Sequence, residues 1–328
     1  MSKLATSPGR RLWTAAQFVL LVATLAWAGL AVRSQWSAVR HSWQSTDVHW
    51  GWVGAASVIV LGTYATLIQS WRMLVGGWGG RLPFAAATRI WTIANLGRYI
   101  PGKLWSVGAL GVLASREGVS GVAAAGAAIL GTLLNIGAGF GIMALSSSRV
   151  LSMFKPWLQT VSVAVSIAFG VGTLLLPWIL PPVLRRVAFW RGQPPPERQL
   201  PAGTLWIATG INALSWVLYG LAFAAFARGV APQVIASPSL FIVIWAASYL
   251  GGYLVLFAPG GIGVRDVVLT GGLIALGLAN SADATLLALA SRVWLTVLEI
   301  LPGVLALLWS PLAPRAESRR ARSGHRDA

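Results

Sequence analysis

The chain has no cysteine, eight acidic residues and only three histidines among its 328 residues. Without cysteine, a disulfide, a thiol nucleophile and a thiolate metal site are all excluded. His41, His49 and His325 lie in a predicted loop, at the edge of a predicted span and in the C-terminal tail. None of them belongs to an HExxH motif or to an acidic cluster, so the sequence predicts no metal site and no cofactor.

Charged residues of either sign are also scarce, at 10% of the chain, whereas 56% is hydrophobic. This balance is typical of a polytopic membrane protein rather than a soluble domain. The net charge of +17 fits the positive-inside bias of membrane proteins. Residues 311–328 are predicted to be a basic cytoplasmic tail that touches anionic headgroups. No aromatic and basic platform accompanies this tail, so nucleic-acid binding is not predicted.

The hydrophobic runs predict six full membrane spans, because about 20 apolar residues cross a bilayer as a helix. They lie in a single transmembrane domain, residues 12–310, between a cytoplasmic N-terminus, residues 1–11, and the tail. Its halves, about 12–180 and 204–310, are joined by a linker at 181–203. The predicted spans are Leu12–Val32, Trp50–Gln69, Val119–Leu145, Leu158–Leu180, Thr204–Phe226 and Ala284–Trp309.

The positive charges favour one orientation of these spans. With the N-terminus inside, the inside loops hold more arginines than the outside loops. Both termini are therefore predicted to be cytoplasmic. Within the third span, Asn135 predicts a hydrogen bond between helices, and the pair Gly137 and Gly141 predicts close helix packing.

Two further apolar segments are interrupted by Pro-Gly steps. Pro101-Gly102 lies within residues 88–116, and Pro259-Gly260 lies within residues 239–280. Proline removes a backbone donor and glycine loosens the chain, so each segment is predicted to be two helices with a break between them. Such a break survives in lipid only where protein or a wet cavity surrounds it.

The orientation of the spans predicts how the two broken segments run. Each must return to the face that it left, so both are predicted to be re-entrant hairpins, entering from opposite faces. Each hairpin lies between two full spans, which is the pattern of an inverted repeat in transporters. The predicted fold is thus all-α, with six spans and two hairpins. In the alternative fold, residues 240–257 and 266–280 are ordinary spans, and the chain crosses the membrane eight times.

Charged residues flank the first break. Arg98 and Lys103 have side chains long enough to reach the cytoplasmic interface, which is one interpretation of both. The other interpretation is that they hold a lipid phosphate beside the free N–H groups of a broken helix. Charge at membrane depth is costly and usually marks a pathway or a ligand.

Arg265 and Asp266 follow the second break. Neighbouring residues on a helix point about 100° apart, so the two are not expected to pair with each other. Arg265 is the stronger candidate for binding an anionic headgroup, whereas Asp266 also fits a favourable charge at a helix N-terminus. The glycines Gly261 and Gly263 let the backbone approach a ligand or simply make a turn.

The last span carries Arg292 and Glu299, seven residues apart and therefore on one face of a helix. This spacing, about 10 Å along the axis, does not favour a direct pair, so each is expected to find its partner on another helix. Arg292 is a further candidate for substrate binding. Proton coupling through Glu299 is an alternative to a purely structural role. Glu117 is expected only to solvate the start of a helix.

These motifs carry a family resemblance. The segments Leu96–Trp105 and Ala258–Asp266, followed by Ser291-Arg292 in the last span, look like the signature of flippase-like membrane proteins. These proteins share the transmembrane region of bacterial lysyl-phosphatidylglycerol synthetases. The resemblance implies a lipid flippase fold with re-entrant segments. The chain ends soon after its last span, so the soluble aminoacyl-transfer domain, and with it aminoacylation, is not expected.

The resulting functional hypothesis is a flippase or translocase of anionic phospholipids or lipid-linked precursors, and not an enzyme. Its partners would be membrane lipids, with a homo-oligomer or a lipid-biosynthesis enzyme as a further association. Two alternatives come from other classes: an integral-membrane enzyme of lipid or polyprenyl-phosphate-sugar metabolism, and an accessory subunit of such an enzyme. An enzyme of this kind usually needs clustered carboxylates or a histidine, which the predicted spans lack.

Overall fold

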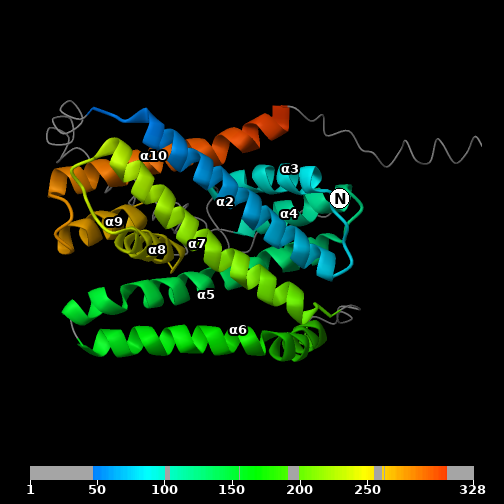
Figure 1. Ribbon diagram of the computed structural model, residues 1–328. Helices are drawn as coiled ribbons and strands as arrows, with labels where there is room; N and C mark the ends of the chain where they lie inside the picture. The colour runs from blue at the N-terminus through cyan, green and yellow to red at the C-terminus, as the bar shows by residue number, and fades with distance from the viewer. Residues whose placement is uncertain are drawn as a thin grey trace, which may run out of the picture.

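The computed structural model describes residues 47–99, 104–154, 156–190, 199–254, 261 and 263–308. Throughout these ranges the regular structure is helical, without a strand, and the predicted all-α class is confirmed (Figure 1). Long helices run along the molecule, and shorter helices fill its two ends. The predicted span Leu12–Val32 lies outside the described residues.

Five helices are long and apolar enough to cross a membrane, and they correspond to the other five predicted spans. The predicted span Leu158–Leu180 corresponds to the apolar stretch Gln159–Val183, and its helix continues to Trp190, inside the predicted linker. The five helices are α2 (Trp50–Gly77), α5 (Gly121–Phe154), α6 (Pro156–Trp190), α7 (Ala202–Val230) and α10 (Ser281–Leu308).

Shorter helices flank the two Pro-Gly steps. Around the first lie α3 (Phe84–Asn95), the 3₁₀ helix η1 (Leu96–Tyr99) and α4 (Leu104–Arg116); around the second lie α8 (Pro238–Leu254) and α9 (Val264–Ala275). Because a helix rises 1.5 Å per residue, α3, α4 and α9 extend only about 18–20 Å, less than the roughly 30 Å of a hydrocarbon core. Separate helices therefore lie on both sides of each Pro-Gly step, and the two steps themselves lie outside the described residues.

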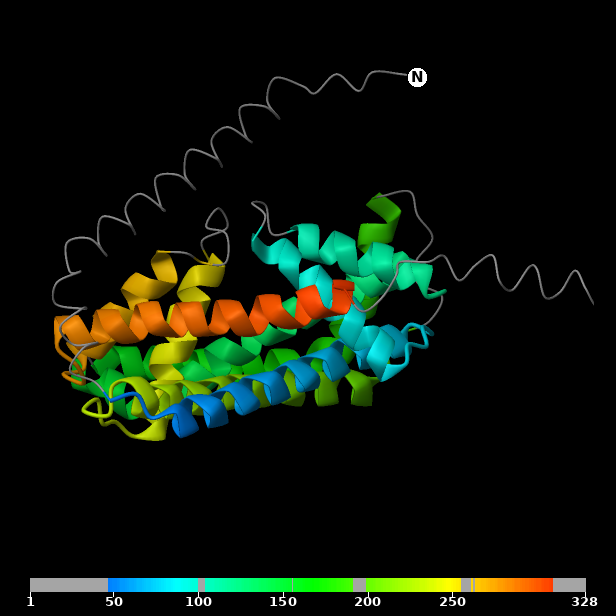
Figure 2. The ribbon, with the colours of Figure 1, turned by 90° about the horizontal axis from the view of Figure 1, so that it is seen from above.

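The two broken segments occupy opposite ends of the helix bundle. In Figure 1, α3 and α4 lie towards the right end and α8 and α9 towards the left, and Figure 2 gives the same arrangement from above. The long helix α10 contacts both α3 and α9. This arrangement agrees with hairpins that enter from opposite faces. Their depth in a bilayer, and hence the choice between re-entrant hairpins and eight spans, stays a prediction.

Polar side chains link α5, α7 and α2 in the interior of the bundle. Asn135 donates to Asn212 Oδ1 at 3.1 Å and to Ser215 Oγ at 3.3 Å. Asn212 in turn donates to Ser70 Oγ at 3.1 Å. The predicted role of Asn135 as a bond between helices is thereby confirmed. Such bonds hold helices together where apolar packing alone does not distinguish a neighbour from lipid.

Small residues permit close contact between α5 and α6. A Cβ added at Gly137 or Gly141 would lie 2.5 or 2.7 Å from the ring of Phe169 on α6. The predicted close packing at this pair is confirmed, since only glycine leaves room for the ring.

Another close approach joins α10 to the first broken segment. A Cβ at Gly303 would lie 2.7 Å from the backbone oxygen of Thr92 and 2.9 Å from Leu96, just before the break. Gly303 follows Pro302, which lies inside α10. This third Pro-Gly step therefore sets the contact of α10 with α3.

We expect Gly303→Ala to destabilise the protein by about 1–3 kcal/mol, because the added methyl group meets backbone rather than a flexible side chain. Thermal unfolding in detergent measures the effect. Gly210→Ala on α7 is the matched control, since a Cβ there meets nothing within 4 Å. Equal unfolding temperatures for the two variants would contradict a tight contact between α10 and α3.

Candidate functional site

Arg98, beside the first break, pairs with the last helix. Arg98 is in η1, and its Nη1 lies 2.6 Å from Glu299 Oε1 on α10. The Glu299 side chain is only 8% exposed and that of Arg98 28%. Breaking a largely buried ion pair costs more than forming it gains, because one charge is then left without its partner. Arg98 therefore pairs with a buried carboxylate of α10, and its position relative to the cytoplasmic interface stays a prediction.

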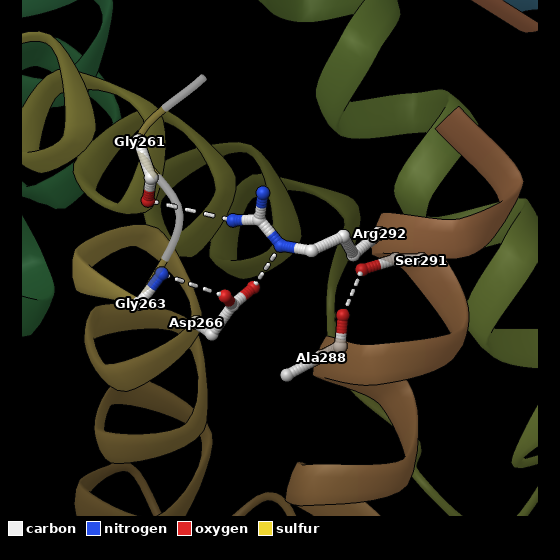
Figure 3. A network of polar contacts seen from close by, with 6 residues as sticks. All are labelled: Gly261, Gly263, Asp266, Ala288, Ser291 and Arg292. Carbon is white, nitrogen blue, oxygen red and sulfur yellow. Dashed lines mark hydrogen bonds and ion pairs between the residues drawn. The ribbon is translucent and has the colours of Figure 1, made fainter. Parts of the chain in front are cut away.

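A second ion pair joins the second break to the same helix, and in this pair α10 supplies the arginine and not the carboxylate (Figure 3). Arg292 on α10 donates from Nε to Asp266 Oδ1 at 2.7 Å, and its Nη2 makes a long contact of 3.5 Å with the Gly261 oxygen. The other carboxylate oxygen of Asp266 accepts the N–H of Gly263 at 3.1 Å. Asp266 thus caps the N-terminus of α9, as predicted, and also pairs with Arg292.

Backbone conformation explains the glycines at this break. Gly261 and Gly263 have φ of +68° and +84°, in a region that side chains with a Cβ rarely adopt. The turn that they make aims the Gly263 N–H at Asp266 and the Gly261 oxygen towards Arg292 (Figure 3).

Helix α10 therefore connects the two breaks. Arg292 and Glu299 lie about 10 Å apart along its axis, and each pairs with a different broken segment. The prediction that they do not pair with each other, and that their partners are on other helices, is confirmed. A proton could reach the Glu299 carboxylate only after the pair with Arg98 opened, so proton coupling through this residue stays a prediction.

Among the described residues, no carboxylate pairs with Arg265. Its guanidinium lies over the rings of two residues of α8, 4.5 Å from the centroid of Trp245 and 3.7 Å from that of Tyr249. The side chain is buried, and Nη2 has no hydrogen-bond partner among the described residues. Aromatic faces stabilise a cation without neutralising it. Arg265 is thus a buried positive charge that can still accept an anion.

Three tyrosines lie side by side next to the second break. The Tyr219 ring neighbours those of Tyr64 and Tyr249, with centroids 6.3 and 6.1 Å apart. Tyr249 also lies under the Arg265 guanidinium. Within the described ranges no direct contact joins Arg98 and Arg265, so a single headgroup site made by both arginines stays a prediction.

Sequence reasoning missed the tyrosines. The chain has only five, and four of them, Tyr64, Tyr219, Tyr249 and Tyr253, form one chain of neighbouring rings. The fifth, Tyr99, belongs to the first break. The chain has eighteen tryptophans but few tyrosines, so each tyrosine could have been examined as a candidate site residue. Tyrosine differs from an apolar ring by a hydroxyl that can form hydrogen bonds.

Several predicted residues lie outside the described ranges or away from this centre. Lys103, Pro101, Gly102, Pro259 and Gly260 are outside the described residues. Elsewhere, Glu117 was expected only to solvate a helix start, but it forms an ion pair with Arg89 of α3.

The chemistry of the centre favours binding of an anion. Its described charges are three arginines, Arg98, Arg265 and Arg292, against two carboxylates, Asp266 and Glu299. Both carboxylates form ion pairs, with Arg98 and with Arg292, so the charge of Arg265 remains unneutralised among these residues. A surplus cation buried among aromatic rings is strongly stabilised by a negative ligand, because the low local dielectric strengthens the attraction.

Fold and centre together define an all-helical, multi-pass membrane protein with two broken segments joined by ion pairs to one helix. The sequence matches the family described as "Lysylphosphatidylglycerol synthase TM region" over residues 14–303. The chain belongs to this family, as the motifs predicted. No curated protein matches the chain.

Proposed function

We propose that this protein moves lipids with anionic headgroups, either phospholipids or lipid-linked precursors, between the leaflets of a bacterial cytoplasmic membrane. The observation that carries the proposal is Arg265, a buried arginine beside the second Pro-Gly segment with no carboxylate partner among the described residues. Charge buried inside a membrane domain usually marks a substrate path. Membership of a family defined by the membrane region of a lipid synthase supports a lipid as the ligand.

The broken segments suggest how a headgroup would pass. Each break ends near the ion pairs of α10, and the two segments occupy opposite ends of the bundle. In this proposal the headgroup passes along the arginines while its acyl chains stay in lipid. Asp266 and Arg292 hold the second break in shape, and Arg98 and Arg265 attract the phosphate. Both termini are cytoplasmic in this scheme.

Reconstituted protein tests the proposal. In vesicles with a headgroup-labelled anionic lipid, a membrane-impermeant quencher reaches only the outer half of the label if nothing crosses the bilayer. We expect the purified protein to make the inner half accessible as well, and more so for anionic than for zwitterionic lipid. Unchanged protection of the inner half would contradict lipid movement. Chemical turnover of the lipid by protein alone would favour the enzyme alternative.

A further inference from the structure

Two buried hydrogen-bond donors on α8 and α9 lie near each other and have no partner among the described residues. They are the indole Nε1 of Trp245, in a side chain 1% exposed, and Nη2 of Arg265, in a side chain 6% exposed. The Arg265 guanidinium carbon is 4.5 Å from the Trp245 ring centroid. Each of these two neighbouring side chains therefore has a donor that lacks a hydrogen-bond acceptor.

The described residues around them do not supply that acceptor. Both groups donate and neither accepts, so they cannot satisfy each other. The carboxylates of the centre are engaged, Asp266 by Gly263 and Arg292, and Glu299 by Arg98. Buried donors are almost always paired in native proteins, so two neighbouring exceptions call for an explanation.

We propose that Trp245 and Arg265 form one binding site for a phosphodiester monoanion, with Trp245 a specificity-determining residue. The inference rests on the proposed function and names its substrate class. A phosphodiester offers two acceptor oxygens and one negative charge, which matches two donors and the single surplus positive charge of the centre. A headgroup with an additional ammonium group finds no unengaged carboxylate among the described residues of the centre. The site therefore favours an anionic lipid over a zwitterionic one.

Both donors belong to buried side chains on tightly packed elements. A Cβ on Gly261 would lie 3.0 Å from the Gly252 backbone of α8, and a Cβ on Gly252 would lie 3.6 Å from the Cβ of Arg265. In this proposal α8 and the start of α9 move apart when a headgroup enters.

The test compares two substitutions that each remove an unpartnered buried indole N–H. Trp245→Phe removes the donor beside Arg265 and keeps an aromatic face. Trp78→Phe is the matched control, because Trp78 Nε1 is also buried without a partner in the described structure but packs against Gly126 and not an arginine. Isothermal calorimetry in neutral detergent measures binding of dioctanoyl phosphatidylglycerol and of dioctanoyl phosphatidylcholine. Dimethyl phosphate, a diester without acyl chains, is the third probe.

We expect Trp245→Phe to weaken binding of the phosphatidylglycerol at least about tenfold, the effect of losing a hydrogen bond to a charged group. Trp78→Phe should bind like the unaltered protein, which should prefer phosphatidylglycerol to phosphatidylcholine. Dimethyl phosphate should compete with the lipid, since the site recognises the diester. Lack of competition, equal affinity for the two lipids, or an unchanged affinity in Trp245→Phe would each overturn the site.

Failure of this site and failure of the proposed function are distinguishable. If the protein moves lipid in vesicles but Trp245→Phe changes neither binding nor transport, the site is rejected and the proposed function is kept. Binding that depends on Trp245, without lipid movement, supports the site and rejects transport.

Discussion

Glu299→Ala is expected to destabilise the protein by about 3 kcal/mol, more than removal of both Glu299 and Arg98 together. The single substitution leaves the Arg98 charge in the interior without its carboxylate, whereas the double variant leaves no charge there. We take the lower end of the range for a broken buried pair because Arg98 is 28% exposed. Chemical or thermal unfolding in detergent measures the difference.

The pair Arg89 and Glu117 provides the control, since it lies between α3 and the end of α4, away from the tyrosines. Glu117→Ala should cost about 1 kcal/mol or less, as is usual for partly exposed pairs. If the Arg98→Ala and Glu299→Ala effects simply added in the double variant, the ion pair between the first break and α10 would be contradicted.

The second large effect is a loss of lipid movement in Arg265→Ala, by about a hundredfold, with little loss of stability. Arg265 gives up only its stacking on Trp245 and Tyr249, which is worth about 0.5–2 kcal/mol. A headgroup phosphate would lose a charge-assisted contact in a site of low dielectric, which is far more costly. The vesicle assay and thermal unfolding together measure the two effects.

Arg228→Ala is the matched control for this substitution. Arg228 also stacks on a tryptophan, with its guanidinium carbon 5.2 Å from the Trp52 ring, but it lies in the last turn of α7. It should keep full transport. Normal lipid movement in Arg265→Ala, or an equal loss in Arg228→Ala, would remove Arg265 from the path of the headgroup.

Much of the fold could be predicted because the membrane imposes simple rules. Length and hydropathy predicted the five described spanning helices. The lack of a backbone donor in proline predicted that separate helices lie on either side of each Pro-Gly step. Counting positive charges predicted hairpins that enter from opposite faces, which stays a prediction. Helix α6 continues past the predicted span to Trp190, since Pro181 and Pro182 are tolerated inside it.

The partners of the charges could not be predicted from their neighbourhood in the sequence. Arg98 and Glu299 are 201 residues apart, and only the packing of α10 against α3 brings them together. Arg265 and Asp266 are adjacent, yet one lies on aromatic rings and the other binds Arg292. Helix direction predicted that they would separate, but the tertiary structure alone identifies what each of them meets.

The central claim is that Arg265 holds an anionic lipid headgroup. Native mass spectrometry of protein purified in mild detergent tests it most directly, with Arg265→Ala and Arg228→Ala measured beside the unaltered chain. We predict a bound anionic phospholipid or lipid-linked precursor in the unaltered chain and in Arg228→Ala, and its loss in Arg265→Ala. Retention of the same anionic lipid by Arg265→Ala would contradict the account.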